Sequence, residues 1–330
     1  METRKKIAVI GGSGFVGSKL ISKLDKKEVY NLDKRPSPFF KNISSLVDIT
    51  KPEQIKFQKN TETVILLAAE HKDNISPTSL YYDVNVEGTK NVLNEMDKSN
   101  IKNLIFTSSV AIYGINKNNP NENHEVDPFN HYGKSKWEAE KVIQKWFSKS
   151  PKSKSATIIR PTVIFGERNR GNVYNLLKQI CIGKFIMIGS GENKKSMAYV
   201  SNVVHFIMNR IKVSEKGVNI YNYSDSPDLN MNQLVSIIEK KMLLKIPKFK
   251  IPYMIGIIFG YIFDIIAILT KKEVNISSVR VKKFCATTQF NPEKAHSVFK
   301  APYLLIEGLN KTLEFEFLND NDDDVLFYSE

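Results

Sequence analysis

The hydrophobic pattern of the first 166 residues alternates between short, continuously apolar runs and amphipathic segments. Amphipathic segments with helical spacing lie at 15–24, 84–96 and 131–147. Apolar runs that predict strands lie at 6–10, 28–33, 63–69, 103–109 and 155–166. Strands without polar alternation are buried on both faces, which is typical of a parallel sheet between two helical layers. The pattern therefore predicts an α/β domain with a doubly wound parallel sheet over 1–166.

Beyond Gly166 the regular alternation of strand and helix loosens, and glycine-rich polar turns become more frequent. A helix is predicted at 232–244, and the last residues are acidic. We therefore expect a smaller mixed domain over 167–330, with a further contribution to the first domain near 197–223.

The stretch 253–269 is apolar over 17 residues, apart from Asp264, and follows Pro252. A membrane-spanning helix needs about 20 apolar residues, and an aspartate is costly in lipid. A buried helix of the smaller domain or an interfacial helix therefore fits better than a span. Peripheral membrane contact through 253–269 is the less favoured expectation.

Charge and composition exclude several classes of protein. The 330 residues carry a net charge of +13, but the basic residues are mostly dispersed lysines, with seven arginines. No dense basic run or binding motif accompanies them, so we expect no nucleic-acid partner. Cys181 and Cys285 cannot form a disulfide framework, the five histidines lack metal-ligand spacing, and no signal peptide precedes the first strand. We expect no metal and a reducing, cytoplasmic location.

A glycine loop follows the first predicted strand and opens the first helix. Gly11, Gly14 and Gly17 form the pattern G-x-x-G-x-x-G, which lets a backbone turn approach a pyrophosphate at a helix N-terminus. Asp33 ends the second strand, where a carboxylate can hold the adenosine ribose. The loop predicts a bound dinucleotide, and Asp33 favours NAD. Lys34 and Arg35 leave NADP open.

Tyr132 and Lys136 are candidate catalytic residues, because their spacing of four places them on one face of the predicted helix 131–147. A nearby ammonium favours the phenolate, so we expect Lys136 to lower the pKa of Tyr132. The pair suits proton transfer with a substrate hydroxyl. Ser108 and Ser109 end a buried strand, where α/β sheets place ligands, and either serine could face the site.

Taken together, the motifs resemble the extended short-chain dehydrogenases, and more narrowly the NAD-dependent epimerase/dehydratase family that acts on nucleotide sugars. The resemblance covers about 5–205 and rests on GGSGFVG, Asp33, LAA at 67–69, NVEGT at 85–89, TSSVAIYG, YGKSK and RPTVIFG. It implies a Rossmann-type domain, a C-terminal substrate-binding domain and a homodimer.

The resemblance also assigns roles to individual residues. It selects Ser109 over Ser108, because the family's Ser or Thr lies four before the Tyr of a Tyr-Gly pair, here Tyr113. The implied catalytic triad is Ser109, Tyr132 and Lys136. The implied cofactor contacts are Gly11, Gly14, Phe15, Val16, Gly17, Asp33, Asp48, Ile49, Leu67, Ala68, Ala69, Asn85, Tyr132, Lys136, Pro161 and Val163. Substrate contacts are expected among His71, Arg168, Arg170, Asn172, Lys195 and Arg280.

The expected function is that of a nucleotide-sugar 4-epimerase acting by transient oxidation at the sugar C4. Dehydratases of this group resemble T-D-E where this chain has Ser109, Val110 and Ala111, so the acidic pair for water elimination is missing. Tyr132 is expected to take the proton of the 4-hydroxyl group. The alternatives are an NAD(P)H-dependent nucleotide 4-keto-sugar reductase and, third, a 3β-hydroxysteroid dehydrogenase-like oxidoreductase.

Overall fold

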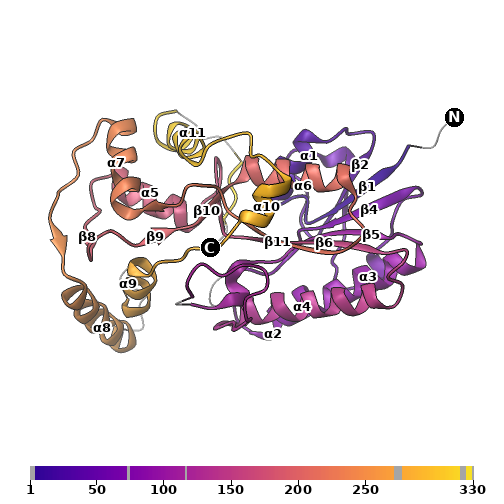
Figure 1. The fold of residues 1–330 in the computed structure, drawn as a ribbon, viewed down its shortest axis with the longest axis horizontal. Coiled ribbons are helices and arrows are strands. Elements are labelled where there is room, and N and C mark those ends of the chain that lie inside the picture. Colours follow the sequence, from indigo (N-terminus) through magenta and orange to yellow (C-terminus); the bar gives the residue numbers. More distant parts are fainter. Residues whose placement is uncertain (1–3, 73–74, 116, 271–276, 320–324, 329–330) are drawn as a thin grey trace.

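A seven-stranded parallel sheet forms the centre of the larger part of the molecule (Figure 1). The computed structural model describes residues 4–72, 75–115, 117–270, 277–319 and 325–328. The strand order is β11-β6-β5-β4-β1-β2-β3, and every neighbouring pair is parallel. The strands are β1 (Lys6–Ile10), β2 (Val29–Asp33), β3 (Ser44–Leu46), β4 (Thr61–Leu66), β5 (Asn103–Thr107), β6 (Ser155–Pro161) and β11 (Gly217–Tyr223).

Helices cover both faces of this sheet, as the apolar runs predict. Successive side chains of a strand point to opposite faces, so Val9 of β1 packs in one core and Ala8 and Ile10 pack in the other. Figure 1 shows α1 and α6 on one side of the sheet and α3 and α4 on the other. These helices are α1 (Phe15–Lys23), α3 (Gly88–Lys98), α4 (His131–Ser148) and α6 (Val200–Val213). The expectation of a doubly wound Rossmann-type sheet is confirmed.

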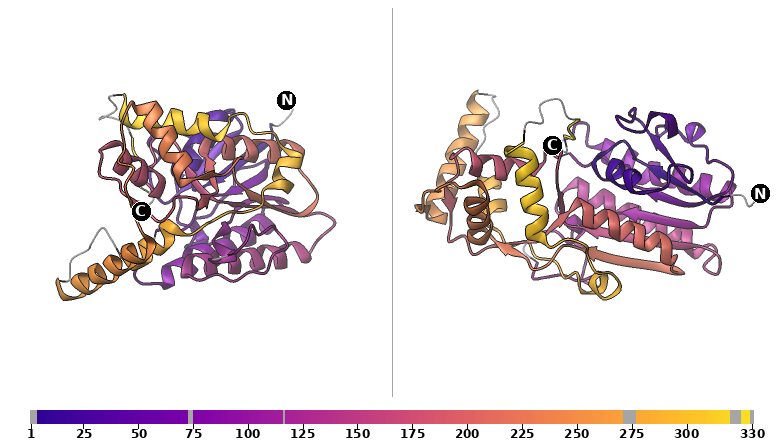
Figure 2. Two further views of the ribbon diagram at one scale, coloured as in Figure 1. Left: turned by 60° about the vertical axis from the view of Figure 1, so that its left-hand side comes forward. Right: turned by 90° about the horizontal axis from the view of Figure 1, so that it is seen from above.

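The smaller part is built from short strand pairs and helices, and it lies beside the carboxyl ends of the large sheet (Figures 1 and 2). Its strands pair as β7–β10, β9–β12 and β8–β13. Its elements are β7 (Val163–Phe165), α5 (Asn172–Cys181), β8 (Met187–Ile188), β9 (Lys194–Lys195), β10 (Met197–Tyr199), β12 (Leu229–Asn230), α7 (Met231–Met242), β13 (Lys250–Ile251), α8 (Tyr253–Thr270), α9 (Ser278–Cys285), α10 (Glu293–Val298) and α11 (Leu305–Phe317).

Short helical turns connect several of these elements. The 3₁₀ turns are Lys41–Ile43, Pro52–Gln54 and Val110–Tyr113, the last labelled η4. The short helix α2 (Ser79–Tyr82) leads into a π-helical turn at Asp83–Glu87, which continues as α3. The predicted helix 84–96 therefore begins in a wider turn, in which Asn85 is buried.

The single strand predicted at 155–166 is divided at Thr162. The part before Thr162 is β6, which pairs with β11 of the large sheet, whereas β7 pairs with β10. The chain thus leaves the large sheet at Pro161. Thr162, between β6 and β7, lines the cavity described below.

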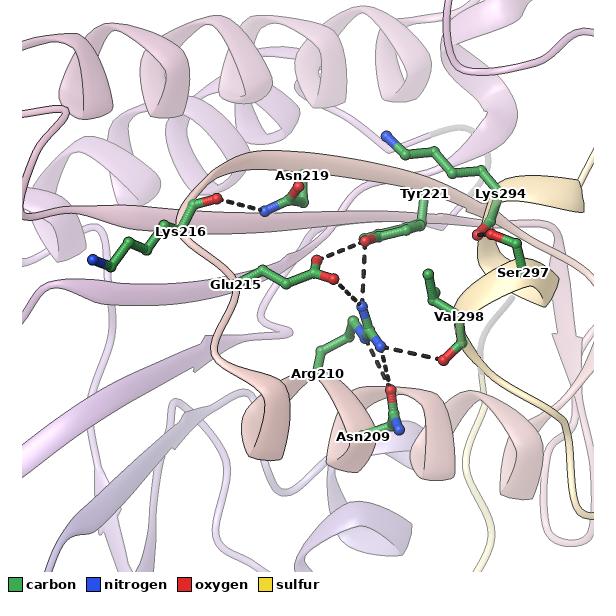
Figure 3. Close-up of polar contacts among 9 residues, drawn as sticks. All are labelled: Asn209, Arg210, Glu215, Lys216, Asn219, Tyr221, Lys294, Ser297 and Val298. Atoms are coloured by element: carbon green, nitrogen blue, oxygen red, sulfur yellow. Dashed lines mark hydrogen bonds and ion pairs between the residues drawn. The ribbon is translucent and has the colours of Figure 1, made fainter.

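The far edge of the sheet is held by a polar cluster around Arg210 of α6 (Figure 3). Arg210 Nη1 donates to Glu215 Oε1 at 2.9 Å, and Glu215 Oε2 accepts from Tyr221 of β11 at 2.6 Å. Arg210 Nη2 also donates to the carbonyl oxygen of Val298 at the end of α10, at 3.5 Å. The buried Arg210 side chain thus connects α6, β11 and the end of α10.

Helix α8 corresponds to the apolar stretch 253–269, and most of its surface is exposed. Only 17% of its 18 residues are buried inside the molecule, so the alternative of a buried helix is wrong. Its length and composition are those of a membrane-crossing helix. Figure 2 shows it projecting from the side of the smaller part.

Candidate functional site

A cavity of about 620 Å³ lies at the carboxyl ends of β1, β4, β5 and β6. The larger part supplies one wall, including Gly11, Asp33 and Tyr132. The smaller part supplies the other, including Asn172 and Lys283. This is the edge of a parallel sheet at which α/β proteins bind ligands.

The glycine loop forms the floor of this cavity. Gly11 has φ +89°, and a Cβ added there would lie 2.5 Å from the amide nitrogen of Ala68. A Cβ on Gly17 would lie 2.5 Å from the carbonyl oxygen of Gly11, so α1 packs directly on the loop. A Cβ on Gly14, by contrast, would meet nothing closer than 3.5 Å, because Gly14 faces the cavity. The loop therefore presents bare backbone to a ligand at the N-terminus of α1.

Asp33 holds the end of β2 against this loop. Its Oδ2 accepts from Ser13 N and its Oδ1 from Arg35 N, both at 2.9 Å. A carboxylate has about four acceptor positions, so further positions remain for a ribose hydroxyl. Lys34 and Arg35 also line the cavity beside Asp33.

Tyr132 and Ser109 lie together because α4 begins close to the η4 turn. Asn130 caps α4 by accepting from Gly133 N at 2.8 Å, and a Cβ on Gly133 would lie 2.5 Å from the carbonyl oxygen of Ala111. This close approach brings the Tyr132 hydroxyl into a hydrogen bond with Ser109. Ser109 also caps η4, because its Oγ accepts from Ala111 N at 3.1 Å.

Lys136 lies one turn further along α4, and it is 2% exposed. Its Nζ donates to the carbonyl oxygen of Thr107 at 2.7 Å and lies 4.6 Å from the centre of the Phe106 ring. Burial lowers the pKa of Lys136 to about 7, and the charge of Glu140 opposes this change. Lys136 therefore exchanges between its ammonium and amine forms near physiological pH.

The expected lowering of the Tyr132 pKa is wrong for this structure. Burial raises the pKa of Tyr132, and only the hydrogen bond with Ser109 opposes that effect. Lys136 directs its ammonium group toward Thr107 and has itself lost much of its tendency to hold a proton. Desolvation outweighs the hydrogen bond with Ser109, so Tyr132 holds its proton more tightly than free tyrosine.

A buried ion pair fixes α4 to the sheet below the cavity. Glu140, one turn beyond Lys136, accepts from Arg160 Nε at 3.0 Å and from Nη2 at 2.6 Å. Arg160 Nη1 donates to the Tyr113 hydroxyl at 2.7 Å, which in turn donates to Asn222 Oδ1 at 2.8 Å. This network joins α4, β6, η4 and β11, so it sets the position of the helix that carries Tyr132 and Lys136.

Asn85 lies behind the cavity wall and braces it. Its amide accepts from Glu70 N at 2.8 Å and donates to Glu70 O at 2.9 Å. It also donates to Ser135 Oγ at 2.8 Å, and Ser135 donates to the Tyr132 carbonyl at 2.9 Å. Asn85 therefore connects the segment after β4 to the first turn of α4.

The structure brings most of the expected cofactor residues to one wall. Those that line the cavity are Gly11, Gly14, Phe15, Val16, Gly17, Asp33, Asp48, Ile49, Leu67, Ala68, Ala69, Tyr132, Lys136, Pro161 and Val163. The expected catalytic residue Ser109 lines it too, whereas Asn85 does not. Two of the expected substrate residues, His71 and Asn172, also line it.

The four cations expected to meet the substrate are not among the residues that line the cavity. Arg170 pairs with Glu316, and the guanidinium of Arg168 lies 5.3 Å from the centre of the Phe39 ring. Lys195 donates to the carbonyl oxygens of Lys283 and Ala286, at 2.8 and 2.6 Å. Arg280 is exposed on α9.

Several lining residues were not assigned to the site from the sequence, where Ser108 was named only as the alternative to Ser109. Ser108 Oγ and Thr162 Oγ1 are buried without a hydrogen-bond partner and face a space in which a polar ligand can pair with them. Phe129, Ser196 and Lys283 complete the wall nearest the smaller part. Phe129 could have been found from the sequence, because it directly precedes the residue that caps α4. Ser196 and Lys283 could not, because they lie in the region without regular periodicity. Among the described residues, no group of three or more His, Cys, Asp or Glu is placed to hold a metal ion.

Comparison with known proteins agrees with this geometry. The model of the NAD dependent epimerase/dehydratase family matches residues 7–223. N-acetyl-alpha-D-glucosaminyl-diphospho-ditrans,octacis-undecaprenol 4-epimerase of Escherichia coli O157:H7 is 56% identical, over 98% of this chain and 99% of that one. UDP-glucose 4-epimerase of Vibrio cholerae is 29% identical, over 84% of this chain and 89% of that one.

Solved structures show the same fold. MoeE5 in complex with UDP-glucuronic acid and NAD superposes with a TM-score of 0.72 at 22% identity, covering 94% of this chain and 98% of that one. With the family model and the close relative, the resemblance expected from the motifs is confirmed. The chain belongs to the NAD dependent epimerase/dehydratase family.

Proposed function

We propose that this protein is an NAD-dependent 4-epimerase whose substrate is N-acetylglucosamine joined through a diphosphate to a polyprenol. The observation that carries the proposal is 56% identity, over almost the whole of both chains, to an epimerase named for that substrate. The cavity supports it, because one wall suits a dinucleotide and the opposite wall includes Lys283 of α9, the helix that packs against the exposed apolar helix α8.

In the proposed reaction, Tyr132 exchanges a proton with the sugar 4-hydroxyl group through its phenolic oxygen. Ser109, which hydrogen-bonds Tyr132, holds the oxygen of the reacting carbon in place. The glycine loop and Asp33 would hold NAD, which when bound would supply reversible hydride transfer at the sugar C4. Lys136 donates to the carbonyl oxygen of Thr107 in the same part of the cavity and, when protonated, stabilises the Tyr132 phenolate.

We also propose NAD rather than NADP as the cofactor of this chain. The Asp33 carboxylate lies at the end of β2 and repels a phosphate on the adenosine ribose. Bare backbone at Gly14 suits the pyrophosphate. The unpaired hydroxyls of Ser108 and Thr162 are further polar groups that a bound ligand can satisfy.

The test is incubation of the purified protein with N-acetylglucosaminyl-diphospho-polyprenol in detergent, and separately with UDP-N-acetylglucosamine. We expect the 4-epimer of the lipid-linked sugar without added reductant, and no product with Tyr132→Phe. Tyr82→Phe is the control, since Tyr82 contacts His131 beside the site but does not line the cavity. Failure with both substrates refutes the 4-epimerase. Product from the nucleotide sugar alone refutes the polyprenol assignment, and stoichiometric NADH consumption with a 4-keto sugar favours the reductase.

The expected homodimer and cytoplasmic location stay predictions. Light scattering during size-exclusion chromatography measures the first, and cell fractionation measures the second.

A further inference from the structure

Helix α8 carries an exposed apolar surface that the proposed chemistry does not use. The α8 surface consists of Tyr253, Met254, Ile255, Ile258, Phe259, Tyr261, Ile262, Ile265, Ile266, Ile268 and Leu269. Single exposed apolar side chains are ordinary, but a continuous set of this size on one helix marks an interaction surface.

One stripe of α8 attaches the helix to the rest of the molecule. Gly256, Gly260 and Asp264 are spaced four apart and so share one face. A Cβ on Gly256 would lie 2.5 Å from Ile188, and one on Gly260 would lie 2.7 Å from the Cα of Ser278. Asp264 accepts from Ser278 N at 3.3 and 3.2 Å through its two oxygens. The aspartate is thus turned toward α9, which leaves the opposite side of α8 apolar.

This attachment determines how α8 can meet a lipid bilayer. The 18-residue helix is about 27 Å long. Its attached stripe contacts β8 and α9 over at least two turns, and a membrane-crossing helix would need to separate from both. The helix is therefore built to lie along a surface, with Ile258, Ile262 and Ile265 on the side away from the protein. Figures 1 and 2 show α8 beside α9 at the periphery of the smaller part.

Basic residues border the α8 surface and lead to the cavity. Arg280, Lys282 and Lys283 are exposed on α9, which packs against α8. Lys282 Nζ donates to the Tyr261 hydroxyl at 2.9 Å, at the border of the apolar surface. Lys283 lines the cavity, as does Ala286 just after α9. An apolar helix face bordered by cations matches the charge of an anionic lipid surface.

We propose that α8 and α9 dock this protein onto the surface of an anionic phospholipid bilayer. The sugar diphosphate of a membrane-anchored polyprenol then reaches the cavity past Lys283, while its hydrocarbon tail stays in the bilayer. The identity of that lipid-linked sugar rests on the proposed function, whereas the docking rests on the α8 surface itself. A second copy of this chain fits the surface less well, because face-to-face packing would bring two sets of α9 cations together.

The first test is vesicle flotation with the full chain, using vesicles of phosphatidylethanolamine and phosphatidylglycerol without any sugar lipid. The variant Ile258→Glu, Ile262→Glu, Ile265→Glu places three carboxylates on the α8 surface. The control variant Val213→Glu, Ile306→Glu, Leu318→Glu adds the same charge at exposed apolar positions away from α8. Val213 lies at the end of α6, Ile306 lies in α11 and Leu318 follows α11. We expect the wild type and the control to float, and the α8 variant to bind at least about tenfold less vesicle.

The second test separates docking from catalysis. We expect the α8 variant to epimerise a short-chain glycosyl diphosphate in detergent at the wild-type rate, and to lose most turnover of the long-chain lipid embedded in vesicles. Wild-type protein that does not float overturns the docking proposal even when it is active. Protein that floats but epimerises neither substrate supports docking and refutes the proposed function. A wild-type dimer that the α8 variant converts to a monomer, without flotation of the wild type, assigns the α8 surface to a second copy and overturns the proposal.

Discussion

Replacing Lys136 by methionine should stabilise the cofactor-free protein while abolishing its activity. Burial lowers the pKa of Lys136 from 10.5 to about 7. Because the folded-state pKa lies below the unfolded-state value, the unfolded chain binds the proton more tightly at neutral pH, and this difference destabilises the fold. At pH 7 the destabilisation is about 4 kcal/mol. Loss of the hydrogen bond to Thr107 lowers the free energy of unfolding by about 1 kcal/mol. Lys136→Met should therefore raise the free energy of unfolding by about 3 kcal/mol in total.

The pH dependence of the stabilisation shows whether it comes from removal of the buried ionisable group or from better packing of the methionine side chain. The destabilisation fades as pH rises from about 7 toward 10.5, so the advantage of Lys136→Met should shrink by about 2 kcal/mol between pH 7 and pH 9. Urea unfolding at both pH values measures it, with Lys134→Met as the control, since Lys134 is exposed on the same helix. A variant that is less stable than the wild type at pH 7, or an advantage that does not change with pH, would refute the reasoning.

Three further predictions concern the cavity and its support. Gly17→Ala should prevent stable folding, because its Cβ would lie 2.5 Å from backbone atoms, whereas Gly14→Ala should melt normally but bind NAD more weakly in calorimetry. A normally folded Gly17→Ala protein would contradict the close packing of α1. Glu140→Gln and Arg160→Met should each cost about 3–5 kcal/mol in urea unfolding, and the double variant less than their sum; additive losses would show that the pair does not act as a unit. Asp33→Ala should raise kcat/KM for NADP relative to NAD, and an unchanged ratio would remove Asp33 from cofactor selection.

The larger part of the fold was predictable because its signals are local in sequence. The glycine loop, the acidic end of β2 and the start of α4 each occupy a few consecutive residues, and α4 begins at His131 as expected. That Ser109 meets Tyr132 depends on the close approach of Gly133 to Ala111, which no spacing along the chain reveals.

The substrate side was less predictable because its contacts join distant segments. Arg170 pairs with Glu316, which lies 146 residues further along, and Lys195 binds the carbonyl oxygens at the end of α9. Neither partner could be chosen from composition. The apolar stretch that forms α8 is equally consistent with burial and exposure until the elements that pack on it, β8 and α9, are known.

The pairing of β6 with β11 places a strand from the second half of the chain in the large sheet. β11 comes after the whole segment 162–216, yet it pairs with β6 along seven residues, from Ser155 to Pro161. A fragment ending at residue 166 would leave that edge of the sheet uncovered, and such edges seed intermolecular aggregation. Conversely, protease cleavage in a surface loop between β7 and β10 should yield two pieces that remain associated and unfold together, since the first piece holds six strands of the large sheet and the second holds β11.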